Sequence, residues 1–399
     1  MRKRFGMVYF ILAIVLSRGI GLAADGSDKE TKWLGEKIME NGVAVISNPA
    51  SPQYGQVKLD LREVAAIASG ENRQDLFKWI DKIIVAHDDS LYALEGNKCT
   101  IYHFDKNGIF INKFGKKGEG PGEFKRPSDL CCDAKHNLYV LDGTIISVFN
   151  SAGEHKKQIK LPKYAHEFIV VPDGGFIVSG TDYSEKSSEY VVERYNERID
   201  KKKDIFRVFA KKNTQRQAGK RHLTFHVDHV YQPLLVFEKT IAGRCIFGNA
   251  LEYELQVIGE SGEVIKRIMK AERPKKISAK EKEIIYNFYA PKYEKKWTKA
   301  VLKEAVQFPD HRPFYNKILG DDQGRLFVFK VGSVLDGEKN GNVHADLFNC
   351  EGCFVHEVVM PFVPDFIKNG ILYWISEDDE SGEVAIKLYQ VQNWQQLKK

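Results

Sequence analysis

Two histidines and an aspartate lie close together in the chain and could bind a metal ion. Three residues separate His222 from His226, and one residue separates His226 from Asp228. Because alternate residues of a strand point to the same side, all three would share one face of a strand. Two imidazoles and a carboxylate are a plausible ligand set. On a strand, however, side chains two positions apart are about 7 Å apart, so one ion reaches both histidines only if the strand bends. A polar outer strand face is the preferred interpretation, and a metal site is the alternative.

Cys350 and Cys353 have the spacing of a redox motif. They lie in a predicted hairpin turn and not at the start of a helix, where a reactive thiolate would be stabilised. We expect a structural disulfide or a free pair of thiols, and not oxidoreductase chemistry. Serine hydrolase chemistry has no support either, because no Gly-x-Ser-x-Gly sequence occurs.

The first residues of the chain resemble a secretory signal peptide. A basic start, Met1 to Phe5, is followed by the apolar run 6–16 and then by small residues, with predicted cleavage after Ala23. The apolar run is shorter than the roughly 20 residues of a spanning helix, so we expect no stable membrane span after cleavage. An uncleaved membrane anchor is the alternative. The chain is therefore predicted to be exported, to the periplasm or the extracellular space.

The charge balance excludes one class of partner. The whole chain has a formal charge of +6, and residues 1–23 contain four basic and no acidic residues. The remaining chain then has a charge of about +2, without the clustered basic face that nucleic acid requires. We therefore expect no nucleic-acid partner.

A repeated unit dominates the rest of the sequence. Each unit has a tight polar turn, a short apolar strand and a further strand, with a period of roughly 40 to 50 residues, typical of β-propeller blades. The second strands of six units centre on Leu91, Leu138, Phe176, Ile246, Leu326 and Leu372. The predicted fold is all-β, a six-bladed β-propeller with a small helical insertion on one face. The predicted domains are a signal peptide (1–23), a linker (24–41) and the propeller (42–399). We expect Val43 to Ile46 to supply the missing outer strand of the last blade.

Loop lengths differ between the two faces of the predicted propeller. The turns between strands one and two, and between three and four, are short, whereas the long segments are predicted on the opposite face. They are 115–127, 181–189, 211–221, 270–313 and 332–342. Insertions on one face of a repeat array usually mark its binding face. In the largest, 270–313, Ser278 begins a predicted helix with a capping box, and a second short helix is predicted after it.

Residues 113–127 contain the phrase Lys-Phe-Gly-Lys-Lys-Gly-Glu-Gly-Pro-Gly-Glu-Phe-Lys-Arg-Pro. This segment is predicted to cross from one blade to the next. Together with Leu138 to Asp142, it resembles the corresponding crossing of the exported bacterial six-bladed β-propeller family, which is NHL-repeat-like. The resemblance implies the fold and names no ligand. Some propellers that resemble this chain are metal-dependent lactonases and lyases, which hold an ion at the central channel mouth.

The preferred interpretation is a non-catalytic module that binds a protein, peptide or glycan partner. The expected contacts lie on the long-loop face and are Lys116, Lys117, Glu119, Arg126, Asp142, Tyr289, Tyr293 and Trp297. No catalytic residues and no cofactor are predicted. The alternative is a metal-dependent hydrolase or lyase of the lactonase type, with a divalent ion at the channel mouth.

Overall fold

The computed structural model divides into residues 1–32 and residues 33–399, and the account below concerns the second part. The structure describes 32–68, 77–183, 188–210, 216–218, 221–223, 228–229, 235–239, 244–293, 306–333, 335, 341–378 and 380–397. The predicted signal peptide, 1–23, lies outside these residues.

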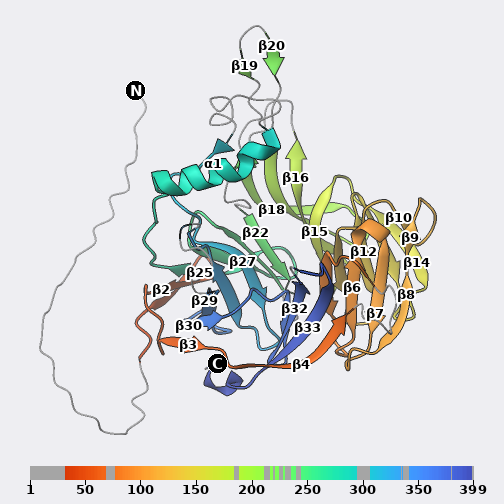
Figure 1. Cartoon of the computed structure of the whole chain (residues 1–399), viewed down its shortest axis with the longest axis horizontal. Coiled ribbons are helices and arrows are strands. Elements are labelled where there is room, and N and C mark those ends of the chain that lie inside the picture. The colour runs from red at the N-terminus through yellow and green to blue at the C-terminus, as the bar shows by residue number, and fades with distance from the viewer. Residues whose placement is uncertain are drawn as a thin grey trace, which may run out of the picture. The chain divides into compact units, whose positions relative to one another are not determined.

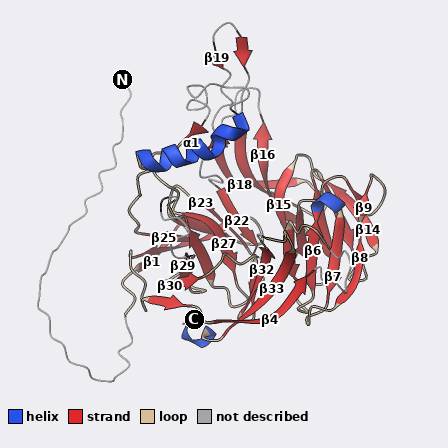
Figure 2. Ribbon diagram, in the orientation of Figure 1, coloured by secondary structure: helices blue, strands red, loops and turns tan. Residues whose placement is uncertain are grey.

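Six antiparallel sheets form the blades of a β-propeller (Figures 1 and 2). Blade 1 contains β5 (Lys82–Val85), β6 (Leu91–Glu95), β7 (Thr100–Phe104) and β8 (Phe110–Phe114). Blade 2 contains β11 (Asp129–Cys132), β12 (Leu138–Asp142), β13 (Ile145–Phe149) and β14 (His155–Lys160). Blade 3 contains β15 (Ala165–Val170), β16 (Phe176–Tyr183), β17 (Ser188–Tyr195) and β18 (Lys201–Ala210). Blade 4 contains β22 (Leu235–Lys239), β23 (Cys245–Asn249), β24 (Glu254–Ile258) and β25 (Val264–Lys270). Blade 5 contains β27 (Tyr315–Gly320), β28 (Leu326–Lys330), β29 (Val343–Phe348) and β30 (Phe354–Met360). Blade 6 contains β31 (Phe366–Lys368), β32 (Ile371–Glu377), β33 (Val384–Val391) and β4 (Leu61–Ala68). The predicted fold class is confirmed.

The blades follow the turn chemistry of the sequence. All six predicted second strands form, as β6, β12, β16, β23, β28 and β32. The third and fourth strands of blade 2 are joined by a turn in which the Gly153 N–H donates to Asn150 O at 3.0 Å. Gly153 has a φ of +83°, which glycine adopts without steric cost, and Gly352 has a φ of +95° in the matching turn of blade 5. Strand alternation then places one face of each blade against the next blade.

The propeller is closed by an N-terminal strand, but not by the one predicted. β4 pairs with β33 and becomes the outer strand of blade 6. The predicted strand, Val43 to Ile46, lies in β2 (Val43–Asn48), which pairs in parallel with β25 of blade 4. The prediction was right that a strand from the N-terminal region completes the last blade, and wrong about which one. β4 fits because Ile67 is buried in the core between blades 6 and 1.

Further strands extend two blades. β1 (Glu36–Glu40) pairs with β2 at the outer edge of blade 4, and β3 (Gln56–Lys58) pairs with β30 of blade 5. The linker prediction for 24–41 is therefore wrong for residues 36–40, which form a strand. The remaining elements are β9 (Lys116–Lys117), β10 (Glu123–Phe124), β19 (Arg216–Ala218), β20 (Arg221–Leu223), β21 (Asp228–His229), β26 (Val306–Gln307), α1 (Ala279–Tyr293), η1 (Gly96–Lys98) and η3 (Trp394–Gln396).

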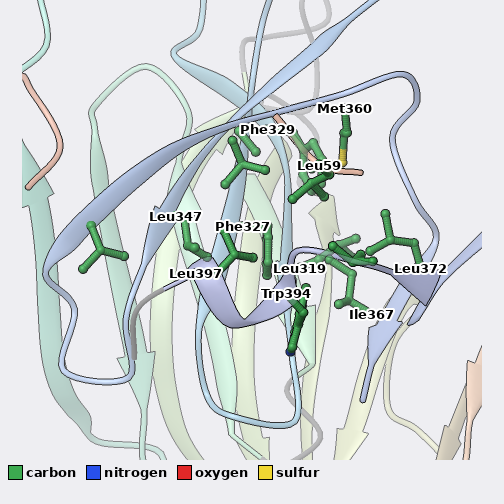
Figure 3. Packing of buried hydrophobic residues seen from close by; sticks show 14 of the residues in the cluster. Leu59, Leu319, Phe327, Phe329, Leu347, Met360, Ile367, Leu372, Trp394 and Leu397 are labelled. Atoms are coloured by element: carbon green, nitrogen blue, oxygen red, sulfur yellow. The ribbon is translucent and has the colours of Figure 1, made fainter. Parts of the chain in front are cut away.

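The core between blades 5 and 6 includes residues from both ends of the described chain (Figure 3). Leu59 precedes β4, whereas Trp394 and Leu397 follow β33, and all three are buried. The buried Arg325 guanidinium lies 4.2 Å from the centre of the Trp394 ring and donates to Leu397 O at 3.1 Å. The two ends of the propeller are thus fixed to each other. In the part of the chain that the structure describes, no helix has the length and apolar character required to cross a membrane.

Candidate functional site

The predicted long segments lie on one face of the propeller. Because the first strand of each blade begins where the crossing from the previous blade ends, the crossings and the turns between second and third strands share one face. We call this the loop-bearing face and the opposite one the short-turn face. Figure 1 shows α1 and the β19–β20 hairpin on the same side of the blades. The residues of these segments at 184–187, 211–215, 219–220, 294–305, 334 and 336–340 lie outside the described chain.

The crossing 115–127 is held in place by its own polar contacts. The Asp142 carboxylate accepts the backbone N–H groups of Lys125 at 2.6 Å and Arg126 at 3.0 Å. The ammonium of Lys116 lies 3.0 Å from the Glu123 carboxylate. Asp142 therefore fastens the crossing to the end of β12. Its predicted role as a partner contact competes with this structural one.

Two more of the predicted contacts in the crossing are exposed. The Glu119 carboxylate lies 2.7 Å from the Lys125 ammonium, and both side chains are largely in solvent. Lys117 is also exposed, on the two-residue strand β9. Such surface ion pairs are worth about 0–1 kcal/mol, so a partner could exchange them at little cost.

The insertion contains the predicted capping box. Ser278 Oγ accepts the Glu281 N–H at 3.2 Å, and the Glu281 carboxylate accepts the Ser278 N–H at 2.8 Å. The buried Glu281 also accepts a bond from Ser333 Oγ at 2.6 Å, which ties α1 to the segment after β28. Tyr289 and Tyr293 lie in the last turns of α1, with side chains outside the description, and Trp297 and the predicted second helix lie outside it altogether.

The predicted metal candidates are not brought together by one strand. His222 lies in β20, Asp228 lies in β21, and His226 falls outside the described residues. β20 pairs with β19, whereas β21 pairs with β26, so His222 and Asp228 lie on strands with different partners. Across the described part of the chain, no three His, Cys, Asp or Glu side chains are placed to hold a metal ion.

The second candidate pair lies in a tight turn of blade 5. Cys350 and Cys353 follow β29, where the Gly352 N–H donates to Asn349 O at 2.8 Å. Both are free thiols, Cys350 exposed and Cys353 buried, so the disulfide candidate is not formed here. Burial raises the pKa of the Cys353 thiol, which is the reverse of what an activated thiolate needs.

The exposed Trp and Tyr side chains form a feature of the loop-bearing face that the sequence did not single out. Trp79 lies in the crossing into blade 1, Tyr164 in the crossing into blade 3, and Tyr183 at the end of β16. Their exposed fractions are 46%, 49% and 72%. Among the Trp and Tyr residues whose side chains the structure describes, these three are the exposed ones, and all lie on this face.

Charged side chains from the inner strands of all six blades gather around the central axis. We call them the axial charge cluster, which comprises Lys82, Asp129, Glu167, Glu238, Lys239, Lys317 and Asp365. The Lys82 ammonium lies 3.5 Å from both Asp129 and Glu167. The Lys239 ammonium lies 2.5 Å from the buried Asp129 and donates to Leu130 O at 2.7 Å. The ion pairs therefore link blades 1 to 4 with one another, and the Lys317–Asp365 pair links blades 5 and 6.

Glu238 is the unusual member of the cluster. Its carboxyl group has no hydrogen bond or ion pair to any residue in the described ranges, although its backbone pairs with β23. Burial disfavours the charged form of Glu238, and the negative charge of Glu167 disfavours it further. The ammonium groups of Lys82 and Lys317 favour the charged form, but the net effect raises the pKa of Glu238 to about 8. For Lys82, the carboxylates of Asp129 and Glu167 outweigh the burial of the ammonium and raise its pKa. Glu238 thus carries a proton for much of its time near neutral pH and can donate a hydrogen bond.

The sequence contained a partial signal for this cluster. All seven members lie within or just before the short strands that begin blades, where a charge interrupts the apolar pattern. A charged residue at such a position on an inner strand can point only to the axis or into the core. The predicted blade boundaries were too uncertain in units three to five to apply this rule, so the cluster was missed.

The chain also matches solved structures, and three of them follow. An exported protein from Bacteroides fragilis matches with a TM-score of 0.50 and 13% identity, over 86% of this chain and 100% of that chain. A member of the DUF4221 family from Bacteroides vulgatus matches with a TM-score of 0.47 and 11% identity, over 83% and 98%. A virginiamycin B lyase from Staphylococcus aureus matches with a TM-score of 0.38 and 10% identity, over 76% and 78%. At these identities the likeness concerns the fold.

Comparison with curated proteins gives no match. A family model described as a domain of unknown function, DUF4934, matches residues 71–296, which is more than half of the chain. This range runs from the crossing into blade 1 as far as the helical insertion, and therefore covers the axial residues Lys82 to Lys239. The NHL-repeat resemblance stays a prediction. The chain is a β-propeller that belongs to the DUF4934 family.

Proposed function

We propose that this chain is an exported, non-catalytic binding module that holds a protein, peptide or glycan partner on its loop-bearing face. The observation that carries the proposal is the position of Trp79, Tyr164 and Tyr183, exposed on that face. Trp and Tyr offer a large apolar surface with a polar tip, and they dominate the energetics of many interfaces. The signal-peptide pattern of residues 1–23 supports export, to the periplasm or the extracellular space.

The distribution of exposed apolar residues supports the choice of face. Elsewhere, large exposed hydrophobic side chains are found on outer strands, such as Ile109 and Ile111 at β8 and Met39 on β1. Isolated aliphatic residues on a surface need no explanation. The exposed Trp and Tyr side chains, in contrast, lie in crossings between blades or at the end of β16, on the loop-bearing face.

The test compares a triple variant and a double control variant of the mature chain with the wild type. Partners are crosslinked in the exporting cells, identified by mass spectrometry, purified, and titrated against the wild-type chain. Replacing Trp79, Tyr164 and Tyr183 by Ala should weaken binding by roughly a hundredfold, because each buried aromatic anchor contributes about 1 kcal/mol or more. The control, Ile109→Ala with Ile111→Ala, should bind as the wild type does. Unchanged affinity of the triple variant would refute the placement on this face.

A further inference from the structure

Two pockets open at the loop-bearing end of blade 4, on either side of one short loop. The first has a volume of about 410 Å³ and lies between this loop, residues 250–253, and the ends of β2 and β25. The second has a volume of about 230 Å³ and lies between the same loop and β18 of blade 3. Glu252 and Glu254 line both pockets. The two pockets therefore share a wall that carries two carboxylates.

The cations at these pockets are already neutralised by the protein. In the first pocket, the buried Lys270 ammonium lies 2.6 Å from both Asp346 and Glu272. In the second, the Arg207 guanidinium lies 2.8 Å from Glu189 and 3.1 Å from Asp182. Neither cation is left to attract an anionic ligand.

The two shared carboxylates differ in their contacts. Glu254 is held by the Arg267 guanidinium, with N–O distances of 2.8 and 2.9 Å. Glu252 is exposed, and its side chain has no ion pair or hydrogen bond to any residue in the described parts of the chain. The charge that remains available at the shared wall is therefore one carboxylate. Anionic ligands are disfavoured there and cationic ones are favoured.

Each pocket also has an apolar wall. Tyr253 and Met269 line the first pocket. In the second, the rings of Phe206 and Phe247 have centroids 4.7 Å apart. Lys and Arg side chains match such sites, because their aliphatic stems pack on apolar surface while the charged head reaches a carboxylate. Aromatic rings also attract the cationic head.

We propose that these pockets hold Lys or Arg side chains of a peptide segment that crosses the 250–253 loop, with the Glu252 carboxylate as counter-charge. The inference rests on the proposed binding role of the loop-bearing face and names a peptide as the partner. The amide of Asn249 and the hydroxyl of Ser47 at the pocket walls supply further hydrogen-bonding groups for the peptide. Specificity for basic residues follows from the unpaired carboxylate and not from the net charge of the chain.

The test uses an end-blocked, fluorescent peptide in which Gly alternates with Lys, and the same peptide with Glu in place of Lys. Fluorescence anisotropy with the mature chain should show binding of the Lys peptide alone, weaker at about 300 mM than at about 50 mM salt because charges are screened. Glu252→Gln should weaken this binding roughly fivefold, as expected for one partly exposed ion pair.

The matched control is Glu260→Gln, the same charge change in the exposed turn at the short-turn end of the same blade. It should bind the Lys peptide as the wild type does. No binding of the Lys peptide, equal binding of the Glu peptide, or an equal effect of the two substitutions would overturn the inference. Each of these results leaves the aromatic-variant experiment unaffected, so failure of this site and failure of the proposed function are distinguishable.

Discussion

At the scale of single residues, the axial charge cluster contains two acidic side chains, Asp129 and Glu238, with different contacts. Asp129 is buried, and the Lys239 ammonium and the Phe168 N–H both contact its carboxyl group. Glu238 lacks such partners in the described chain and has a raised pKa instead. A carboxyl group with close partners and one without them therefore lie on the inner strands of blades 2 and 4. The difference follows from local contacts and not from the overall charge.

This difference predicts a pH effect on stability. With a pKa raised from 4.5 to about 8, folded Glu238 binds its proton more tightly than the unfolded chain does. The free energy of unfolding should therefore fall as the pH rises between these two values. Glu238→Gln removes the ionisable group and should stabilise the fold at about pH 9, by roughly 4–5 kcal/mol relative to its effect at about pH 4.

Urea unfolding of both proteins at several pH values measures this difference. Glu260→Gln, on an exposed turn, is the control and should change little at any pH. If Glu238→Gln shifted the free energy of unfolding equally at all pH values, ionisation of Glu238 in the folded protein would not be the cause.

At the scale of elements, the insertion depends on a few polar contacts more than on apolar packing. Ile277 and Ile285 are buried, whereas Ile284 and Phe288 are exposed, so α1 has a narrow apolar contact with the rest of the propeller. Glu281 bonds Ser278 and Ser333, and these bonds outweigh its burial and lower its pKa. One buried carboxylate thus fixes both the start of the helix and its position.

The capping box should therefore control the local stability of α1. Ser278→Ala removes the cap and should destabilise the first turn by about 1 kcal/mol. Glu281→Ala should cost more, because it also leaves the Ser333 hydroxyl and the Arg312 guanidinium without this carboxylate. Hydrogen exchange of the amides of residues 279–285 measures both effects. Glu283→Ala, an exposed change in the same turn, serves as the control; exchange as fast in this variant as in Glu281→Ala would contradict the assigned role.

The sequence was sufficient for local features and insufficient for pairings between distant segments. The second strands of the blades and the turn at Gly153 follow from period and turn chemistry, which act over a few residues. Closure by β4 depends on which of several N-terminal strands best fits the edge of blade 6, and short-range patterns do not encode this. The pairing of β20 and β21 with different strands could not be foreseen for the same reason. Glu238 could be recognised only after the inner strands had been aligned around one axis.

At the scale of the whole propeller, both ends of the described chain meet in blades 5 and 6. Asn393 links them: it accepts the Asp60 N–H and donates to Lys58 O, at 3.0 and 2.9 Å. A ring of blades has no free sheet edge at the point of closure, and opening it exposes two blade cores at once. We therefore expect the propeller to unfold in one cooperative transition in which the closing strand takes part.

This expectation can be tested with two isoleucines on N-terminal strands. Ile67 in β4 is buried between blades 6 and 1, whereas Ile38 in β1 is largely exposed at the edge of blade 4. Ile67→Ala should lower the free energy of unfolding by about 2–5 kcal/mol, because it leaves a cavity in the closing core. Ile38→Ala should change it by less than about 0.5 kcal/mol. Urea unfolding, monitored by tryptophan fluorescence and by circular dichroism, should give coincident transitions for both variants. If Ile67→Ala produced an early separate transition with little change in the main one, the closing strand would be a peripheral attachment and the blades would hold together without it.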